Sequence, residues 1–269
     1  MFSGLYDTLS GAYRKHRPHY PAELFAYLGG LCQDRTVAWD CATGNGQAAV
    51  GLAAQFKFVW ATDSARKQIL NANAHPRVAY SQSDCSESGL PPRSVDLVCV
   101  AQALHWFGDV EPFYREVERV LRPGGVFAAV CFFQPLVNKL VNQRVAELYS
   151  NEAIRRFWYP GFRHIEERYR SLPFPFAAVE PPLSFPMQEE WTWGQFSGYL
   201  RTWPHVARAA NNGEAVAVRQ ALGRIEEVWG DARVRHVITW EVTASIAKKQ
   251  AEPLSWPTGL NKNEHLPSA

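Results

Sequence analysis

The sequence predicts an α/β protein built on a mostly parallel sheet, and three observations support this class. From residue 37 onward, short β-rich runs alternate with helix-like segments, the pattern of strands joined by crossover helices. Hydrophobic residues make up 46% of the chain and charged residues 20%, so the chain can bury a sizeable core. The length of 269 residues suits one large domain with an elaborated lid, since single cores stop growing at roughly 250 to 300 residues.

The first half of the chain is expected to contain five strands. They lie at 37–42, 58–63, 78–84, 94–101 and 126–133. A helix is expected at 21–28, before the first strand, and another between the last two. Asp109 can cap that second helix and Pro112 suits its first turn, while the RPGG run at 122–125 should end it.

The regular alternation ends after residue 133. Helical segments are expected at 135–172 and 191–230, a proline-broken extended segment at 174–185, and an exposed-edge strand at 234–249. Seven of the ten tryptophans lie at or after Trp158. Such large apolar side chains suit either a lid over an organic ligand or the core of a helical insertion.

These segments predict a single domain with appended parts. The expected ranges are a domain at 1–250, an N-terminal lid segment at 1–30, helical cap insertions at 134–175 and 188–230, and a loosely ordered tail at 251–269.

Composition and missing motifs exclude several classes of function. A net charge of +2 gives no strong field to attract nucleic acid or an anionic membrane, so neither is expected as a partner. The five cysteines form no C-x-x-C pair and no apolar run reaches the length of a membrane span, and we expect no signal peptide. Phosphate-loop, serine-elbow and metal-ligand motifs are also missing. We therefore expect a cytoplasmic protein without a metal, acting as a monomer or homodimer.

A glycine-rich turn follows the first expected strand. It reads DCATGNGQ at 40–47 and leads into the helix-like AAVGLAAQF. Such a turn lets a ligand contact the backbone, and the helix N-terminus adds N–H donors for anionic groups. Gly44, Gly46 and Ala49 also satisfy the dinucleotide fingerprint, so the turn by itself leaves the ligand open.

Three carboxylates near successive strand ends indicate the kind of ligand. Asp40 could hold a cationic amino group, Asp63 could accept hydrogen bonds from ribose hydroxyls, and Asp84 could recognise an adenine edge. These carboxylates would repel a pyrophosphate but would suit an adenosine attached to a cationic sulfonium. A nicotinamide-dependent oxidoreductase stays open as an alternative, because Asp63 would serve NAD equally well.

In these features the chain resembles the class I S-adenosylmethionine-dependent methyltransferases, and more narrowly their small-molecule branch similar to trans-aconitate methyltransferases. The resemblance covers about residues 10–250. It is carried by DCATGNGQ, TDSARKQI, SDCSESGLP, SVDLVCVAQALHWF and VERVLRPGGVF, with YRKHRPHYP and FWYPGFRHIEERY beside them. It implies a Rossmann-like fold with a seven-stranded, mostly parallel sheet, an antiparallel last strand and helical lid insertions.

One residue departs from the family pattern. Ala42 stands where the D-x-G-x-G-x-G turn of the family has its first glycine. We expect the methyl group to be tolerated if Ala42 keeps φ below zero. The departure also leaves open a non-catalytic protein that binds the cofactor and regulates a partner.

The resemblance implies S-adenosylmethionine as cofactor and S-adenosylhomocysteine as product. The implied cofactor-binding residues are Arg17, Asp40, Thr43, Gly44, Asn45, Gln47, Asp63, Ser64, Asp84, Cys85 and Gln102. Arg17 is a candidate for the methionine carboxylate, because a guanidinium offers it a planar fork. The alternatives are a surface arginine at Arg17 and turn capping at Asp63 and Asp84.

His105 and Trp106 are the expected catalytic pair, because they follow the fourth strand at the sheet edge where ligands bind. Methyl transfer is an in-line displacement, so alignment of the reactants supplies much of the rate. His105 could act as a base, or it could only hydrogen-bond the backbone and shape the pocket.

The acceptor is expected to be a small molecule, and a carboxylate or a hydroxyl is one option for the group that receives the methyl; the sequence leaves oxygen, nitrogen, carbon and sulfur acceptors open. The residues expected to bind it are Tyr13, Tyr20, Trp106, Trp158, Tyr159 and Arg163.

Overall fold

Helices and strands alternate through the computed structural model, which describes residues 17–179 and 184–250. The strands are β1 (Val37–Cys41), β2 (Phe58–Asp63), β3 (Val78–Gln82), β4 (Val95–Ala101), β5 (Leu121–Phe132), β6 (Ala177–Ala178), β7 (Ser184–Trp191) and β8 (His236–Lys248). The helices are α2 (Ala22–Leu31), α3 (Gln47–Ala53), α4 (Arg66–Leu70), α5 (Glu111–Val120), α6 (Lys139–Ser150), α7 (Glu152–Arg155), α8 (Phe162–Glu166), α9 (Trp193–Arg201), α10 (Pro204–Asn211) and α11 (Ala215–Trp229), with a 3-10 turn η1 (Leu104–Trp106).

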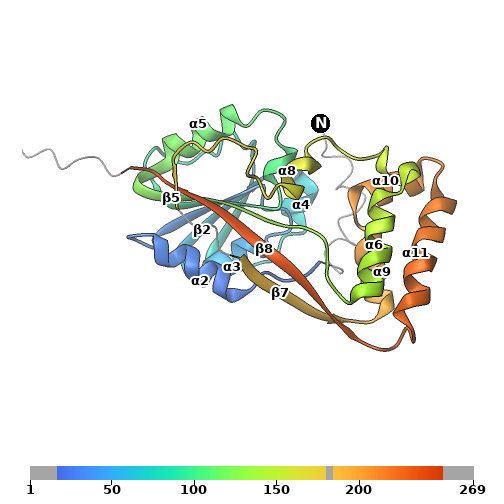
Figure 1. Cartoon of the computed structure of the whole chain (residues 1–269). Coiled ribbons are helices and arrows are strands. Elements are labelled where there is room, and N and C mark those ends of the chain that lie inside the picture. The colour runs from blue at the N-terminus through green and yellow to red at the C-terminus, as the bar shows by residue number, and fades with distance from the viewer. Residues whose placement is uncertain (1–16, 180–183, 251–269) are drawn as a thin grey trace, which may run out of the picture.

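The strands form one sheet whose order is β3-β2-β1-β4-β5-β8-β6 (Figure 1). Every neighbouring pair from β3 to β5 is parallel, whereas β8 runs antiparallel to β5 and β6. The predicted fold class, with seven strands across the sheet and an antiparallel last strand, is confirmed. The chain order reverses between β1 and β4, and ligands of such sheets bind beside this switch point, outside the carboxyl ends of the strands.

The prediction that 234–249 is an exposed-edge strand is wrong. β5 pairs with β8 from Val242 to Lys248, and β7 pairs with the other side of β8 from His236 to Thr243. The outer strands are instead β6 and β7, and the proline-broken segment at 174–185 supplies all of β6 and the start of β7. Pro186 is tolerated there because an edge strand leaves one row of backbone groups unpaired.

Two other elements begin at residues that differ from the expected ones. Residues 188–191 belong to β7, so the second helical part of the cap begins at Trp193 and not at residue 188. The RPGG run does follow the end of α5, but it lies inside β5, whose pairing with β4 shifts register between Val95 and Leu97. β5 therefore starts at Leu121, five residues before the expected start at residue 126. Leu121 pairs with Val95 before the irregularity, and Val126 pairs with Leu97 after it.

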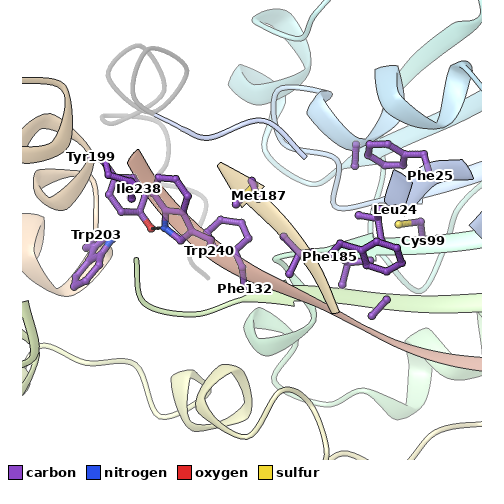
Figure 2. Close-up of a cluster of buried hydrophobic side chains, with 14 of the residues drawn as sticks. Leu24, Phe25, Cys99, Phe132, Phe185, Met187, Tyr199, Trp203, Ile238 and Trp240 are labelled. Carbon is purple, nitrogen blue, oxygen red and sulfur yellow. Dashed lines mark hydrogen bonds between the residues drawn. The ribbon is translucent and has the colours of Figure 1, made fainter. Parts of the chain in front are cut away.

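Hydrophobic residues pack on both faces of the sheet. Helices α2 and α3 cover one face, and α5 with η1 covers the other. The hydrophobic cluster under α2 and α3 continues along β7 and β8 to five helices that we call the cap: α6, α7, α9, α10 and α11. Figure 2 shows this continuity, from Leu24 through Phe185 and Trp240 to Trp203. The cap is thus joined to the sheet by a shared core as well as by the long β7–β8 ribbon (Figure 1).

No helix in the described ranges is long and apolar enough to cross a bilayer.

Candidate functional site

A cavity of about 590 Å³ lies at the carboxyl ends of β1 to β4, beside the switch point. Small-molecule pockets typically have volumes of roughly 300 to 1,000 Å³. Every residue that the family resemblance implies for cofactor binding lines this large cavity: Arg17, Asp40, Thr43, Gly44, Asn45, Gln47, Asp63, Ser64, Asp84, Cys85 and Gln102. Residues separated by more than 80 positions are therefore brought to one place.

The turn between β1 and α3 depends on Gly46. This residue has φ of 85°, in the left-handed region, and a Cβ atom there would overlap the Tyr80 hydroxyl. Tyr80 donates a hydrogen bond of 2.7 Å to the carbonyl of Asn73 and so has little room to move. Both the backbone angle and the close approach thus require glycine at this position.

Ala42 does not have the backbone angle on which its tolerance was expected to depend. Its φ is +55°, not negative, and it lines the large cavity. A left-handed conformation costs a residue with a Cβ about 1 to 2 kcal/mol, because the Cβ crowds the following carbonyl oxygen. The alanine is therefore accommodated with backbone strain that glycine would relieve.

Asp40 is fully buried at the base of this turn. One carboxylate oxygen, Oδ2, accepts a hydrogen bond of 2.5 Å from the Thr43 hydroxyl. The other, Oδ1, and the Asn45 Nδ2 atom are buried without a hydrogen-bond partner in the described part of the chain. Burial raises the pKa of Asp40 to about 7. A cationic group reaching Oδ1 would satisfy that oxygen and favour the ionised carboxylate.

Asp63 joins the ends of two strands. Its Oδ2 accepts from the Gly44 N–H at 2.9 Å and its Oδ1 from the Ala65 N–H at 2.8 Å. Burial raises the pKa of Asp63, and the two N–H groups oppose that shift. The carboxylate therefore braces the glycine turn, as the capping alternative expected, while it also lines the large cavity.

Asp84 is held differently, in a more open loop after β3. Its Oδ1 accepts hydrogen bonds from the Ser86 N–H at 3.0 Å and the Ser86 hydroxyl at 2.8 Å. These bonds lower the pKa of Asp84, which keeps the carboxylate ionised at neutral pH. The loop thus presents a fixed negative charge at the cavity.

A second, smaller cavity of about 70 Å³ adjoins the large one. Four residues line both cavities: Arg17, Gln102, Trp106 and Phe132. The rest of the small cavity is formed mostly by aromatic side chains and comes from η1, β5, the α6–α8 region and α9–α10: His105, Phe133, Gln134, Tyr149, Phe162, Ile165, Tyr199, Trp203, Pro204 and His205.

Gln102 is fixed at the junction of the two cavities. It has φ of 54°, and its side-chain amide makes two hydrogen bonds with one residue of β5. The amide nitrogen donates to the Phe132 carbonyl at 2.9 Å, and the amide oxygen accepts from the Phe132 N–H at 3.0 Å. These bonds hold the chain rigidly where it leaves β4.

His105 lines the small cavity and is not among the residues that line the large one. Its Nδ1 lies 3.0 Å from the Tyr169 hydroxyl, and its ring packs against Trp106 and Phe162. Burial lowers the pKa of His105 to about 3, so the ring is neutral at physiological pH. A base this weak is poorly matched to proton abstraction near pH 7, which favours the pocket-shaping interpretation.

The expected acceptor-binding residues are only partly brought together. Trp106 lines both cavities and Tyr20 lines the large one, whereas Trp158, Tyr159 and Arg163 line neither. Tyr13 lies outside the described residues.

Two of the three residues that miss the cavities, Trp158 and Tyr159, lie behind the cavity walls. Trp158 packs on Tyr149 and His205, and Tyr159 stacks on Trp106 at 5.3 Å between ring centroids. Arg163 is exposed to solvent. The expected aromatic wall therefore exists, but it is formed by the neighbours of the predicted residues.

Gly161 allows the loop between α7 and α8 to pack closely against His105 and Trp106. A Cβ atom at Gly161 would overlap the carbonyl oxygen of His105. The absence of a side chain lets the loop between α7 and α8 touch η1, and Phe162 then packs on both His105 and Trp106.

Sequence reasoning missed most of the small cavity, including Tyr149, Phe162, Tyr199 and His205. Only Trp203 carried a signal, through the tryptophan content of the second half. Phe162 lies in the FWYPGFRHIEERY segment but was not singled out there. Tyr149, Tyr199 and His205 lie on helices, and no motif distinguishes them from core residues.

Residues 39–129 match the family model described as methyltransferase domain. A candidate methyltransferase of Dictyostelium discoideum is 30% identical over 228 residues, which cover 82% of this chain and 86% of that protein. An uncharacterized methyltransferase of Mycobacterium tuberculosis is 37% identical over 122 residues, 45% of this chain and 49% of that protein. A solved structure from Anaeromyxobacter dehalogenans, described as a candidate type II methyltransferase, has a TM-score of 0.80 and 38% identity, and the match covers 88% of this chain and 99% of that one.

Proposed function

Since the chain belongs to the S-adenosylmethionine-dependent methyltransferases, we propose that it methylates a carboxylate or hydroxyl oxygen of a small molecule. One observation carries the proposal: two adjoining cavities of different character share the wall formed by Arg17, Gln102, Trp106 and Phe132. The large cavity has carboxylates and a glycine turn, which suit a sulfonium nucleoside. The small cavity has aromatic walls, which suit an organic acceptor.

The large cavity fits the cofactor in the chemistry of its donors and acceptors. Bound there, S-adenosylmethionine would supply an electrophilic methyl group carried on a sulfonium. Asp63 would accept hydrogen bonds from ribose hydroxyls, and Asp84 with the adjacent backbone would contact the adenine edge. The partnerless Oδ1 of Asp40 would accept from the amino group.

The contribution of the chain to catalysis is mainly alignment. Holding two reactants in register can supply about 7 to 11 kcal/mol of the barrier reduction. Gln102, locked onto Phe132, and Trp106, packed against Tyr159, would keep the shared wall in place. The aromatic rings would exclude water from the acceptor, and neutral His105 would shape the pocket or hydrogen-bond the acceptor.

The acceptor oxygen has two candidate types. A carboxylate is supported by Arg17, which lines both cavities and lies with its guanidinium 5.5 Å from the Tyr199 ring centroid. It needs no base, which agrees with the low pKa of His105. A hydroxyl is supported by His105, whose neutral ring lines the small cavity and could hydrogen-bond it.

Family membership excludes the nicotinamide-dependent oxidoreductase as the leading function. The alternative of a regulator without turnover predicts a plugged acceptor site. The presence of the small cavity beside the large one favours an enzyme.

Cofactor binding is tested by titrating S-adenosylhomocysteine and NADH against intrinsic tryptophan fluorescence. We expect binding of the first and not the second. Asp63→Ala should weaken the affinity by about 1 to 3 kcal/mol, the scale of lost hydrogen bonds to a charged group. Asp34→Ala is the matched control, because Asp34 is exposed and lines neither cavity. An unchanged affinity in Asp63→Ala would refute the ribose role.

Turnover is tested with a labelled methyl donor and a metabolite extract, with mass detection of methylated products. We expect methylated small molecules, which should form more slowly at a limiting donor concentration when Asp63→Ala weakens cofactor binding. Cofactor binding without any methylated product would favour the regulator.

A further inference from the structure

His205 is a buried polar residue that the proposed chemistry does not use. It follows Pro204 in the first turn of α10 and is only 3% exposed. Neither Nδ1 nor Nε2 has a hydrogen-bond partner within the described ranges. Both ring nitrogens of His205 are thus buried at a polar cost, while the residue lines the small cavity.

The surroundings of His205 explain why no side chain pairs with it. Its ring lies between the rings of Tyr149, Trp158, Phe162 and Trp203, at centroid distances from 5.0 to 5.9 Å. Burial lowers the pKa of His205 to about 3. The imidazole is therefore neutral, with one N–H donor and one nitrogen acceptor.

The charges around the small cavity restrict what can bind there. Among its described lining residues no carboxylate is present, and Arg17 carries the one formal charge. A cationic ligand would be repelled by Arg17 and would find no counter-ion. A carboxylate can only accept hydrogen bonds, so it could pair with the N–H nitrogen of His205 but not with the other ring nitrogen. A hydroxyl can serve either nitrogen, because it both donates and accepts.

We propose, building on the proposed function, that His205 anchors a hydroxyl group on a planar, uncharged ring of the methyl acceptor. His205 lines the small cavity and not the large one, so the anchored hydroxyl is a recognition group, distinct from the oxygen that receives the methyl. The rings of Tyr149, Phe162 and Trp203 pack against the planar body of the acceptor. His205 is accordingly a positioning residue that selects hydroxylated rings over their apolar analogues.

The test compares phenol with toluene, two probes of nearly equal shape, on the full-length protein saturated with S-adenosylhomocysteine. Ligand-observed NMR should give a phenol affinity about tenfold higher than that of toluene, the scale of one buried hydrogen bond. His205→Leu should remove this preference, and His205→Gln, which keeps a donor and an acceptor, should restore part of it. The affinity for S-adenosylhomocysteine should stay constant in all three proteins.

A control variant is His75→Leu, because His75 lines neither cavity and should leave the phenol preference unchanged. Equal binding of phenol and toluene by the wild-type protein, or a preference that survives in His205→Leu, would overturn the role of His205 alone. Failure of the wild-type protein to bind S-adenosylhomocysteine would overturn the proposed function and, with it, this inference.

Discussion

The large and small cavities share a wall but are assembled in different ways. Most of the large cavity comes from residues 40–109, and its polar groups are held by neighbours close in sequence, such as Thr43 on Asp40 and Ser86 on Asp84. The small cavity takes its walls from Arg17 and from segments spread from Gln102 to His205. The first is a site made of strand ends and turns, and the second is a product of packing between the cap and the sheet. Changes to one should therefore leave the other measurably intact.

The strongest way to disable the large cavity by itself is Gly46→Ala. The added methyl would overlap the Tyr80 hydroxyl and would impose a left-handed conformation on alanine. We expect a loss of roughly 2 to 5 kcal/mol, divided between the free energy of unfolding and S-adenosylhomocysteine binding. Denaturant unfolding and calorimetric titration measure the two parts. Gly30→Ala is the control, since nothing lies within 4 Å of its added Cβ; an equally mild effect of both variants would contradict the packing argument.

Gly161→Ala should affect the small cavity in the converse way. Its methyl would push the loop between α7 and α8 away from the His105 carbonyl and so displace the wall that contains Phe162. We expect the activation free energy of turnover to rise by about 1 to 3 kcal/mol, the usual scale of overpacking, so that turnover slows. The affinity for S-adenosylhomocysteine should stay nearly unchanged. The control is Gly223→Ala, whose Cβ meets nothing within 4 Å. Equal losses in binding and turnover would show that the cavities are not separable.

The pH dependence distinguishes the cavities through Asp40. Because burial raises the pKa of Asp40 to about 7 from 3.8, the carboxylate ionises as the pH rises through neutrality. A cationic amino group at Oδ1 prefers the ionised form, so cofactor affinity should rise about threefold to tenfold between pH 6 and pH 8. Asp40→Asn should flatten this profile. A rise that persists in Asp40→Asn would assign it to another group, whereas His105 and His205 stay neutral throughout this range.

The same pKa shift affects stability with a defined sign. Between about pH 4 and pH 7 the folded protein keeps the Asp40 proton that the unfolded chain has lost, so this residue makes the free energy of unfolding fall as the pH rises. Above pH 7 its contribution becomes constant. Asp40→Asn should remove this decline, which thermal unfolding across the pH range would detect.

The smallest expected effect is a gain in the free energy of unfolding, in the variant Ala42→Gly. Replacing it with glycine relieves the strain of φ +55° but adds flexibility to the unfolded chain, so the net stabilisation of Ala42→Gly should be about 0.5 to 1 kcal/mol. Denaturant unfolding measures it, with turnover and S-adenosylhomocysteine affinity as companion readouts. Loss of stability in this variant would mean that the alanine methyl contributes packing that outweighs its strain.

The sequence alone located the strands that form the large cavity and placed three carboxylates at one edge of the sheet. Strand periodicity located β1 to β4 within two or three residues, and in a parallel sheet the carboxyl ends must meet at one edge. Asp40, Asp63 and Asp84 could therefore be placed together before any coordinates, because each is fixed by its own strand. The backbone angle of Ala42 could not be foreseen, since it depends on how the turn closes onto Thr62 and Asp63.

Only the tertiary structure decided the rest. β8 alternates like an edge strand, and the fact that β7 covers it follows from long-range pairing that local patterns do not encode. The small cavity depends on which faces of α6, α9 and α10 turn toward the sheet, and Trp158 and His205 look equally suited to core or pocket in the sequence. In the folded protein Trp158 packs behind the wall of the small cavity, whereas His205 lines the cavity itself. Strand ends are set by local periodicity, whereas a cavity between packed elements is set by side chains that meet only after the chain has folded.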